Sequence, residues 1–342
     1  MNKILTILII ALTVISCGDA SIKQGDVLYL RNKGADMPAY VYGNITSNTF
    51  MILLHGGPGG NGLEYRGGQY VEDLEKEIAV VYWDQRGQGN SRGNKHDETL
   101  NMDLLLDDLD QLVLLLKHQY GADINLFLYG HSWGGTYGTK YMMSEKRQSQ
   151  FNGWIESNGA HDIPKLNKEA IKMFIAIGQE EFDKGNHTTD WKEILDFANG
   201  VDTLNISDDE GGTINQHGHK AGGLIDALKT AGDDEFKMPL RNPTDMISSS
   251  IAGGKTANTL MANGIEDIAL TDSLYKIKTP TLLLWGKYDF VVPPQLGYDA
   301  EALIGTTDKE LIIYEFSDHS PMNGEGAVYA ADILRFINNH LK

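Results

Sequence analysis

The feature that most constrains this chain is a serine held between two glycines directly after an apolar run. Residues 126–129 are apolar, Gly130, Ser132 and Gly134 follow, and the next residues favour a helix. This pattern predicts a strand, a sharp turn and a helix, with glycines where strand and helix must approach closely. It would hold the Ser132 hydroxyl out at the end of a sheet, beside the Trp133 N–H at a helix N-terminus. A Gly-Ser loop matches the same pattern, so a nucleophile also requires a base, an acid and a second oxyanion donor elsewhere.

The first residues have the pattern of an export signal. Lys3 precedes an apolar run over 4–15 that is short for a membrane span, so residues 1–16 are predicted to be a signal peptide. Cys17, the single cysteine of the chain, follows directly. The junction resembles a bacterial lipoprotein signal, in which cleavage before Cys17 leaves a lipid-modified N-terminus, although Ile15 stands where a small residue is usual. An ordinary signal peptide or a single anchor helix is the alternative.

Composition restricts the partners of the chain. The 342 residues are 41% apolar and 22% charged, as expected of a soluble globular protein with a sizeable core. The formal charge is -18, and loss of Lys3 with the signal would make it -19. So acidic a surface repels nucleic acid and anionic headgroups. Membrane association would therefore depend on the lipid on Cys17, with residues 17–26 as a tether on the exported side of a bacterial membrane.

The remaining chain alternates between apolar runs and amphipathic segments. Two short alternating segments read as an opening hairpin, at 27–31 and 39–44. A continuous apolar run, typical of a strand buried on both faces of a parallel sheet, occurs at 50–54, and further strands are expected over 78–83, 126–129, 151–157, 281–285 and 311–316. Helices are expected over 98–120 and 325–341, where apolar residues recur at helical spacing. The pattern predicts an α/β fold with a mostly parallel, doubly wound sheet.

The region 158–279 differs from its surroundings. It lacks apolar strand runs and is rich in Gly, Asp and Asn, so we expect a helical cap inserted into a core formed by 27–157 and 280–342. Helices are predicted over 168–181, 191–198 and 222–230. His217 and His219 are interpreted as part of a solvated glycine-rich loop, because no partner for a metal site lies at useful spacing.

Chemically useful residues follow the predicted strands. Residues 55–60 are glycine or proline apart from His55, a composition suited to bringing bare backbone N–H groups against a ligand. Ser132, Asp289 and His319 follow later strands, and carboxyl ends of strands meet at the ligand-binding edge of open α/β sheets. The order Ser, Asp, His therefore predicts a catalytic triad.

A second glycine-rich loop, 84–89, follows the strand over 78–83. We expect Asp84 and Arg86 to pair with each other and brace this loop, which is a structural role. His55 and His131 are interpreted as packing residues.

Together these motifs resemble one known family. The motifs HGGPGG at 55–60, DQRGQG at 84–89 and SWG at 132–134, with the triad order, are similar to those of α/β-hydrolases over 27–342, and to their proline iminopeptidase branch in particular. The resemblance implies the α/β-hydrolase fold with a cap, and it assigns the second oxyanion donor to the Gly57 N–H, beside that of Trp133.

The roles of the triad follow from its chemistry. Ser132 needs a base, His319 is placed to take its proton, and Asp289 would fix the tautomer of that ring. Asp318 is a rival acid, although a sequence neighbour seldom reaches the far nitrogen of the histidine. Such machinery implies acyl transfer to water with neither metal nor organic cofactor.

The acyl group is less constrained. The resemblance implies cap carboxylates that hold the free amino group of a peptide substrate. Glu156, Asp162 and Glu193 are available, and we expect Glu156 or Asp162, which begin the cap beside the active-site edge, in preference to the acidic run 208–210. An aminopeptidase acting on short peptides is the leading hypothesis. An esterase acting on small molecules, and a binding or sensor protein with an idle hydrolase core, are the alternatives.

Overall fold

The computed structural model describes residues 25–93, 95–226, 228 and 246–342. The predicted signal peptide, Cys17 and most of the tether over 17–26 lie outside these residues. Within the described ranges no helix is both long enough and apolar enough to cross a membrane.

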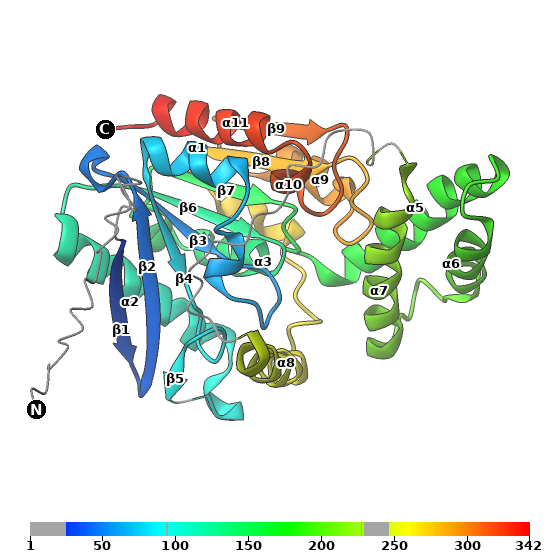
Figure 1. The fold of residues 1–342 in the computed structure, drawn as a ribbon. Coiled ribbons are helices and arrows are strands. Elements are labelled where there is room, and N and C mark those ends of the chain that lie inside the picture. Colours follow the sequence, from blue (N-terminus) through cyan, green and yellow to red (C-terminus); the bar gives the residue numbers. More distant parts are fainter. Residues whose placement is uncertain (1–24, 94, 227, 229–245) are drawn as a thin grey trace, which may run out of the picture.

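A single mixed sheet organises the molecule (Figure 1). Its strands are β1 (Asp26–Asn32), β2 (Ala35–Gly43), β3 (Thr49–Leu54), β4 (Ala79–Trp83), β5 (Arg92–Gly93), β6 (Asn125–His131), β7 (Gly153–Ser157), β8 (Thr281–Gly286) and β9 (Lys309–Tyr314). The order is β1-β2-β4-β3-β6-β7-β8-β9, with β5 paired to β2. Strands β4 to β9 along this path are parallel, and the β1–β2 hairpin joins β4 antiparallel. The predicted α/β architecture is confirmed.

Helices cover both faces of the sheet. The α-helices are α1 (Gln69–Glu77), α2 (Met102–Tyr120), α3 (Trp133–Met142), α4 (Glu145–Gln148), α5 (Ile163–Asp183), α6 (Thr188–Gly200), α7 (Asp208–Leu224), α8 (Met246–Ala262), α9 (Pro294–Leu303), α10 (Pro321–Gly324) and α11 (Gly326–Asn339). Short 3₁₀ turns are η1 (Ile45–Ser47), η2 (Gly62–Tyr65), η3 (Asp97–Thr99) and η5 (Thr271–Lys276). Helices α1 and α11 pack on one face, and α2, α3 and α9 on the other.

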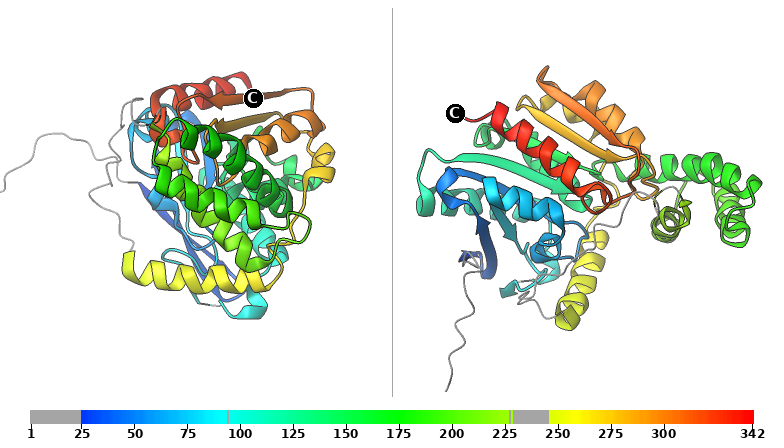
Figure 2. Two further views of the ribbon diagram at one scale, coloured as in Figure 1. Left: turned by 90° about the vertical axis from the view of Figure 1, so that its right-hand side faces the viewer. Right: turned by 45° about the horizontal axis from the view of Figure 1, so that its top comes forward.

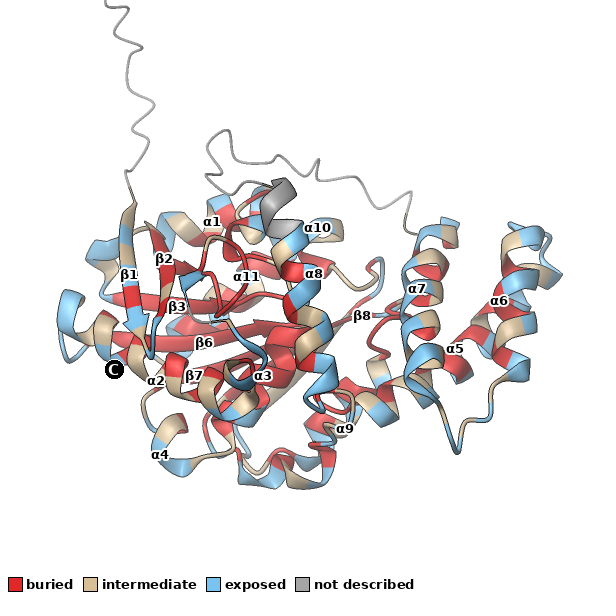
Figure 3. Ribbon diagram, turned by 90° about the horizontal axis from the view of Figure 1, so that it is seen from below, coloured by how far each residue is buried: buried red, intermediate tan, exposed pale blue. Residues whose placement is uncertain are grey.

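The alternation of strand side chains builds these two layers. In β3, Phe50 and Ile52 belong to the cluster with α2 and α3, whereas Met51 and Leu53 face α1 and α11. Each such side chain stabilises the fold by about 1.5–3 kcal/mol relative to exposure. Because both faces are covered, the central strands are buried throughout, as Figure 3 shows.

Strand β3 lies at the point where the order of the sheet reverses. The chain goes from β3 to β4 on one side and then crosses to β6 on the other, so β3 and β6 are parallel neighbours and the loops that follow them begin at the same edge of the sheet. Residues 55–60 and Ser132 follow these two strands, and the topology therefore brings them together.

In the described part of the segment between β7 and β8, the α-helices are α5 to α8. Helices α5, α6 and α7 project beyond the carboxyl ends of the strands, while α8 lies apart from them (Figures 1 and 2). The first three share a small core that includes Phe174 and Trp191, and Phe290 after β8 packs into it. This contact joins the cap to the loop that carries Asp289.

The helix expected over 222–230 lies partly outside the described residues, and its first residues form the end of α7. Helix α7 begins after Ser207, whose hydroxyl accepts the Glu210 N–H while the Glu210 carboxylate accepts the Ser207 N–H. This capping box starts a helix within the acidic run, and the helix ends at Leu224. His217 and His219 therefore lie on α7 and not in a loop.

Candidate active site

The turn between β6 and α3 holds Ser132 in a strained conformation. Its φ is 55° and its ψ is -120°, in the region that non-glycine residues rarely adopt. The flanking glycines are required by close packing: a Cβ on Gly134 would lie 2.0 Å from the Leu54 carbonyl oxygen, and one on Gly130 2.3 Å from that of Gly134. The strand-turn-helix predicted from the glycine spacing is confirmed, and Ser132 lines the cavity described below.

Asp289 and His319 are hydrogen-bonded to each other. His319 Nδ1–H donates to Asp289 Oδ2 over 2.8 Å. The other oxygen, Oδ1, accepts the N–H groups of Val291 and Val292, each at 2.8 Å. Asn158 donates from Nδ2 to Oδ2 over 2.6 Å, from a left-handed backbone with φ of 46°. The four donors fix the carboxylate so that it can orient the imidazole.

The electrostatics favour a basic imidazole. Burial opposes the charged ring of His319, but the Asp289 carboxylate and its hydrogen bond together raise the pKa of His319 above its ordinary value. Of the His319 side chain, 12% is exposed. Among the described residues there is no hydrogen bond from the Ser132 hydroxyl to this ring, and such bonds often tighten only when substrate binds.

Asp318 lies elsewhere in the site. Its Oδ1 accepts the Ser320 N–H at 3.1 Å, and its carboxylate lies near Gly222 of α7. The geometry therefore favours Asp289 over this rival as the partner of His319. Helix α7 also brings His219 to the catalytic histidine, with ring centroids 6.0 Å apart.

The loop 55–60, here called the oxyanion loop, lies directly beside Ser132. A Cβ added to Gly56 would be 3.3 Å from the Ser132 Cβ. Gly57 has φ of 123°, which a side chain would disfavour, and it lines the same cavity as Ser132 and Trp133. His55 Nδ1–H donates to the Gly56 carbonyl over 2.8 Å, which orients the peptide whose N–H belongs to Gly57.

The loop 84–89 braces the oxyanion loop, but the expected pair between Asp84 and Arg86 is wrong. Asp84 accepts the backbone N–H groups of Gly62 and Asn90 at 2.9 and 2.8 Å. Arg86 instead forms a bidentate, fully buried ion pair with Asp108 of α2. Asp84 and Arg86 do not pair because each has other buried partners: backbone N–H groups for Asp84 and the Asp108 carboxylate for Arg86.

Two glutamines in this loop, Gln85 and Gln88, bond to the oxyanion loop and to Trp133, and no motif in the sequence predicted these contacts. Gln88 Oε1 accepts the Gly59 N–H at 2.5 Å. Gln85 donates to the His55 carbonyl at 3.2 Å and accepts the Trp133 indole N–H at 3.0 Å. The side chains of both are fully buried, so these bonds are protected from water.

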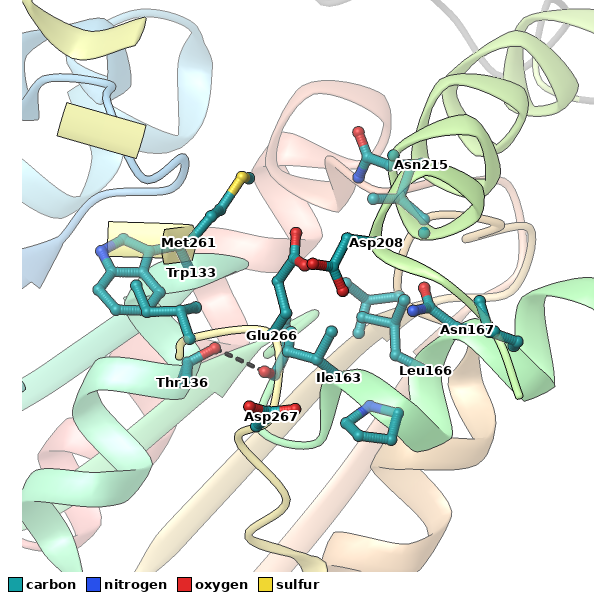
Figure 4. A pocket seen from close by; sticks show the side chains of 18 of the residues that line it. Trp133, Thr136, Ile163, Leu166, Asn167, Asp208, Asn215, Met261, Glu266 and Asp267 are labelled. Carbon is teal, nitrogen blue, oxygen red and sulfur yellow. Dashed lines mark hydrogen bonds between the residues drawn. The ribbon is translucent and has the colours of Figure 1, made fainter. Parts of the chain in front are cut away.

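A cavity of about 530 Å³ lies between Ser132 and the cap. This volume is typical of a small-molecule site. Its walls combine apolar side chains with three carboxylates, Asp208, Glu266 and Asp267; in Figure 4 those of Asp208 and Glu266 lie side by side, and that of Asp267 lies further away. Partial burial and the neighbouring Asp208 and Asp267 raise the pKa of Glu266 above its ordinary value.

The carboxylates chosen from the sequence have other partners. Glu156 is fully buried and accepts from or donates to His161 Nδ1 over 2.7 Å, and Asp162 caps α5 by accepting the Lys165 N–H. Neither lines the cavity, and Glu193 pairs with Lys220 on α6 and α7. Asp208, at the start of the acidic run, lines the cavity instead, because α7 turns that end of the run towards Ser132.

Comparison with known sequences finds similarity to aminopeptidases. A family model described as "Serine aminopeptidase, S33" matches residues 51–191. A proline iminopeptidase of Saccharolobus solfataricus is 29% identical over 321 residues, covering 91% of each chain.

Solved structures with the same fold include a peptidase and an esterase. The proline iminopeptidase of Mycobacterium smegmatis has a TM-score of 0.58 and 17% identity, covering 92% of this chain and 98% of that one. An esterase from Exiguobacterium antarcticum has a TM-score of 0.59 and 18% identity, covering 91% and 98%. At these identities the structures establish the fold and leave the substrate open. The chain therefore has the α/β-hydrolase fold and is a serine hydrolase, with proline iminopeptidases among the proteins to which it is similar.

Proposed function

We propose that this hydrolase is an aminopeptidase that releases N-terminal residues, proline among them, from short peptides. The observation that carries the proposal is that Ser132 and the three carboxylates Asp208, Glu266 and Asp267 line one cavity. The likeness to proline iminopeptidases supports the same substrate class.

The chemistry is acyl transfer to water. Ser132 Oγ attacks the carbonyl carbon of the first peptide bond while His319 Nε2 accepts its proton. The negative charge that develops on the carbonyl oxygen is stabilised by the N–H groups of Gly57 and Trp133. His319 then returns the proton to the leaving amine as the C–N bond breaks. Water, deprotonated by the same imidazole, cleaves the acyl-enzyme and releases the free amino acid. Asp289 stabilises the imidazolium in both steps.

The three carboxylates account for selection of an N-terminus. A substrate with a free N-terminus carries an ammonium group on the Cα that is bonded to the reacting carbonyl carbon. Burying that charge without a partner costs several kcal/mol. The raised pKa of Glu266 reflects its burial and its repulsion by Asp208 and Asp267. A bound ammonium group would relieve this repulsion, so we expect the three carboxylates to favour a cationic substrate.

The test compares free and blocked substrates. Wild-type protein is assayed on proline and other aminoacyl arylamides and on their N-acetyl forms, and then with Asp208→Asn, Glu266→Gln and Asp267→Asn. At least one variant should raise KM for free-amine substrates by roughly tenfold or more, as expected for loss of a charge partner worth ~1.4 kcal/mol. Asp209→Asn is the matched control, because Asp209 is exposed on the same turn of α7 and does not line the cavity.

An esterase is the second candidate. Ile163, Leu166, Met261, Ile265 and Val292 give the cavity an apolar wall suited to an uncharged acyl group. Equal turnover of acetylated and free-amine substrates by the wild type would favour this activity and end the aminopeptidase proposal. A purely binding role would require that neither arylamides nor aryl esters are hydrolysed.

The sequence of the N-terminus supports a location. We infer that the protein is exported and anchored through lipid on Cys17, with residues 17–26 as tether, on the periplasmic or outer side of a bacterial membrane. The signal-like residues 1–16 and the position of the single cysteine support this.

A further inference from the structure

A directional chain of hydrogen bonds links the oxyanion loop to the backbone of the catalytic histidine. The Gly56 N–H donates to the Tyr65 hydroxyl oxygen over 2.8 Å. That hydroxyl lies 2.7 Å from His131 Nδ1, and His131 Nε2 lies 2.7 Å from the His319 carbonyl oxygen. Tyr65 ends the short turn η2, and His131 directly precedes Ser132.

The direction of each bond is determined by the groups present. A carbonyl oxygen only accepts, so His131 Nε2 must carry a hydrogen and donate to His319. Burial, and then the neighbouring His319, lower the pKa of His131 to about 3, so its ring is neutral near pH 7 and Nδ1 is an acceptor. The Tyr65 hydroxyl therefore donates to Nδ1, which leaves its oxygen to accept the Gly56 N–H. Each donor and acceptor in this series of hydrogen bonds, from Gly56 to His319, therefore has a partner.

The rings of Tyr65, His131 and His319 also pack against one another. The Tyr65 and His131 ring centroids are 5.5 Å apart, and those of His131 and His319 are 4.8 Å apart. His131 is 5% exposed, so its orientation is fixed by neighbours and not by solvent.

From this geometry we propose that Tyr65 and His131 are positioning residues that hold the oxyanion loop and His319 in register around Ser132. The proposal rests on the function above, in which Gly57 N–H receives negative charge while His319 becomes positive. Gly56 precedes Gly57, and anchoring its N–H limits how far the loop can move from Ser132 when the oxyanion forms. At the other end, the bond to the His319 carbonyl fixes the backbone from which the base extends.

The main test removes one hydroxyl. Tyr65→Phe should lower kcat by roughly 10- to 100-fold with KM within about twofold, because a misplaced oxyanion donor weakens the transition state more than the ground state. Tyr329→Phe is the matched control: Tyr329 belongs to the same cluster as Tyr65, but its hydroxyl bonds to that of Tyr129 and not to the oxyanion loop.

A second pair of variants tests the histidine. His131→Gln keeps an N–H group that can reach the His319 carbonyl, whereas His131→Leu has none. We expect His131→Gln to retain at least tenfold more kcat than His131→Leu, with both folded by circular dichroism. A packing role alone predicts that leucine, the apolar replacement, is tolerated as well as glutamine.

Two further measurements separate this proposal from the proposed function. The rate at which a fluorophosphonate probe labels Ser132 needs the same oxyanion hole but no peptide substrate, and Tyr65→Phe should slow it by a similar factor. In the inactive Ser132→Ala protein, Tyr65→Phe should also speed hydrogen exchange at the Gly56 amide.

The outcomes are distinct. Labelling of the wild type at Ser132 together with unchanged labelling, kcat and Gly56 exchange in Tyr65→Phe would overturn the positioning role and leave the hydrolase assignment intact. A wild-type protein that is not labelled at Ser132 would remove the proposed catalytic role of Ser132 and this inference with it.

Discussion

Gly59 of the oxyanion loop and Gly253 of α8 lie backbone against backbone. A Cβ on Gly253 would be 2.0 Å from the Gly59 carbonyl oxygen, and one on Gly59 would be 2.6 Å from that of Gly253. Three residues further along α8, the Thr256 hydroxyl donates to the Gly87 carbonyl over 2.6 Å. Helix α8 therefore rests on both glycine loops, and its Met261 lines the cavity. The same helix thus lines the cavity and contacts the oxyanion loop.

This contact predicts a contrast between adjacent glycines. Gly253→Ala should displace α8 or the oxyanion loop, because close-packed backbone cannot absorb a methyl group without a shift that costs about 1–3 kcal/mol. We expect a fall in kcat/KM of roughly tenfold or more. Gly254→Ala is the control, since a Cβ there meets nothing within 4 Å. Equal kinetics for the two variants would contradict the coupling.

We expect the largest losses of kcat from substitutions in the proposed triad. Ser132→Ala and His319→Ala should each lower kcat by roughly 10³-fold or more with the fold intact, because the members act as a unit. Asp289→Asn should also be severe, since it disrupts the bond to His319 Nδ1. A larger loss from Asp318→Asn than from Asp289→Asn would mean that the acid has been assigned to the wrong residue.

The pH dependence follows from the His319–Asp289 pair. Because the pKa of His319 is raised, the neutral base should be lost, and kcat/KM should fall, as pH drops through a value above about 6.5. The free energy of unfolding should depend on pH in the opposite direction. The ion pair contributes fully to stability below the pKa of His319 in the unfolded chain, about 6.5, and this contribution is lost as pH rises through the higher pKa of His319 in the folded protein. A kinetic pH profile and denaturant melts across pH 5 to 9 measure the two. An acid limb centred well below the ordinary histidine value would refute the assignment.

The buried ion pair between Arg86 and Asp108 predicts a stability effect. Arg86→Met would leave the Asp108 carboxylate without its main cation, and removing one partner of a buried pair destabilises by about 3–5 kcal/mol. The exposed pair of Arg335 and Glu310, each side chain 45% exposed, is the control, and Arg335→Met should cost less than about 1 kcal/mol. Urea unfolding of the two variants checks the difference.

The proposed anchor predicts a change of location. Cys17→Ala should convert a membrane-associated, detergent-extracted protein into a soluble exported or unprocessed one, because the lipid on Cys17 is the proposed anchor; one acyl chain alone anchors weakly, so stable attachment needs more than one. Mass spectrometry of the wild-type N-terminus is the decisive measurement. An unmodified Cys17, or cleavage at another position, would exclude the lipoprotein assignment.

Local pattern in the sequence determined the sheet and the reactive residues. Strand runs and turn glycines depend on neighbours in the chain, so the strands, the turn at Ser132 and the order of Ser132, Asp289 and His319 could all be predicted. Parallel strands then place their carboxyl ends at one edge of the sheet, which is why residues so far apart in sequence were expected together.

Tertiary structure decided which partner each polar side chain takes. Asn158 and Asp289 are 131 positions apart, and Arg86 and Asp108 are 22 apart on different elements. No local pattern encodes such pairs, because a buried polar group accepts whichever partner the packing of whole elements brings within about 3 Å. For the same reason the sequence suggested Glu156 and Asp162 as substrate-binding residues, whereas the placement of α7 and α8 over the sheet puts Asp208, Glu266 and Asp267 in the cavity. The sequence determined where the chemistry lies along the chain, and the docking of the cap on the sheet decided what faces it.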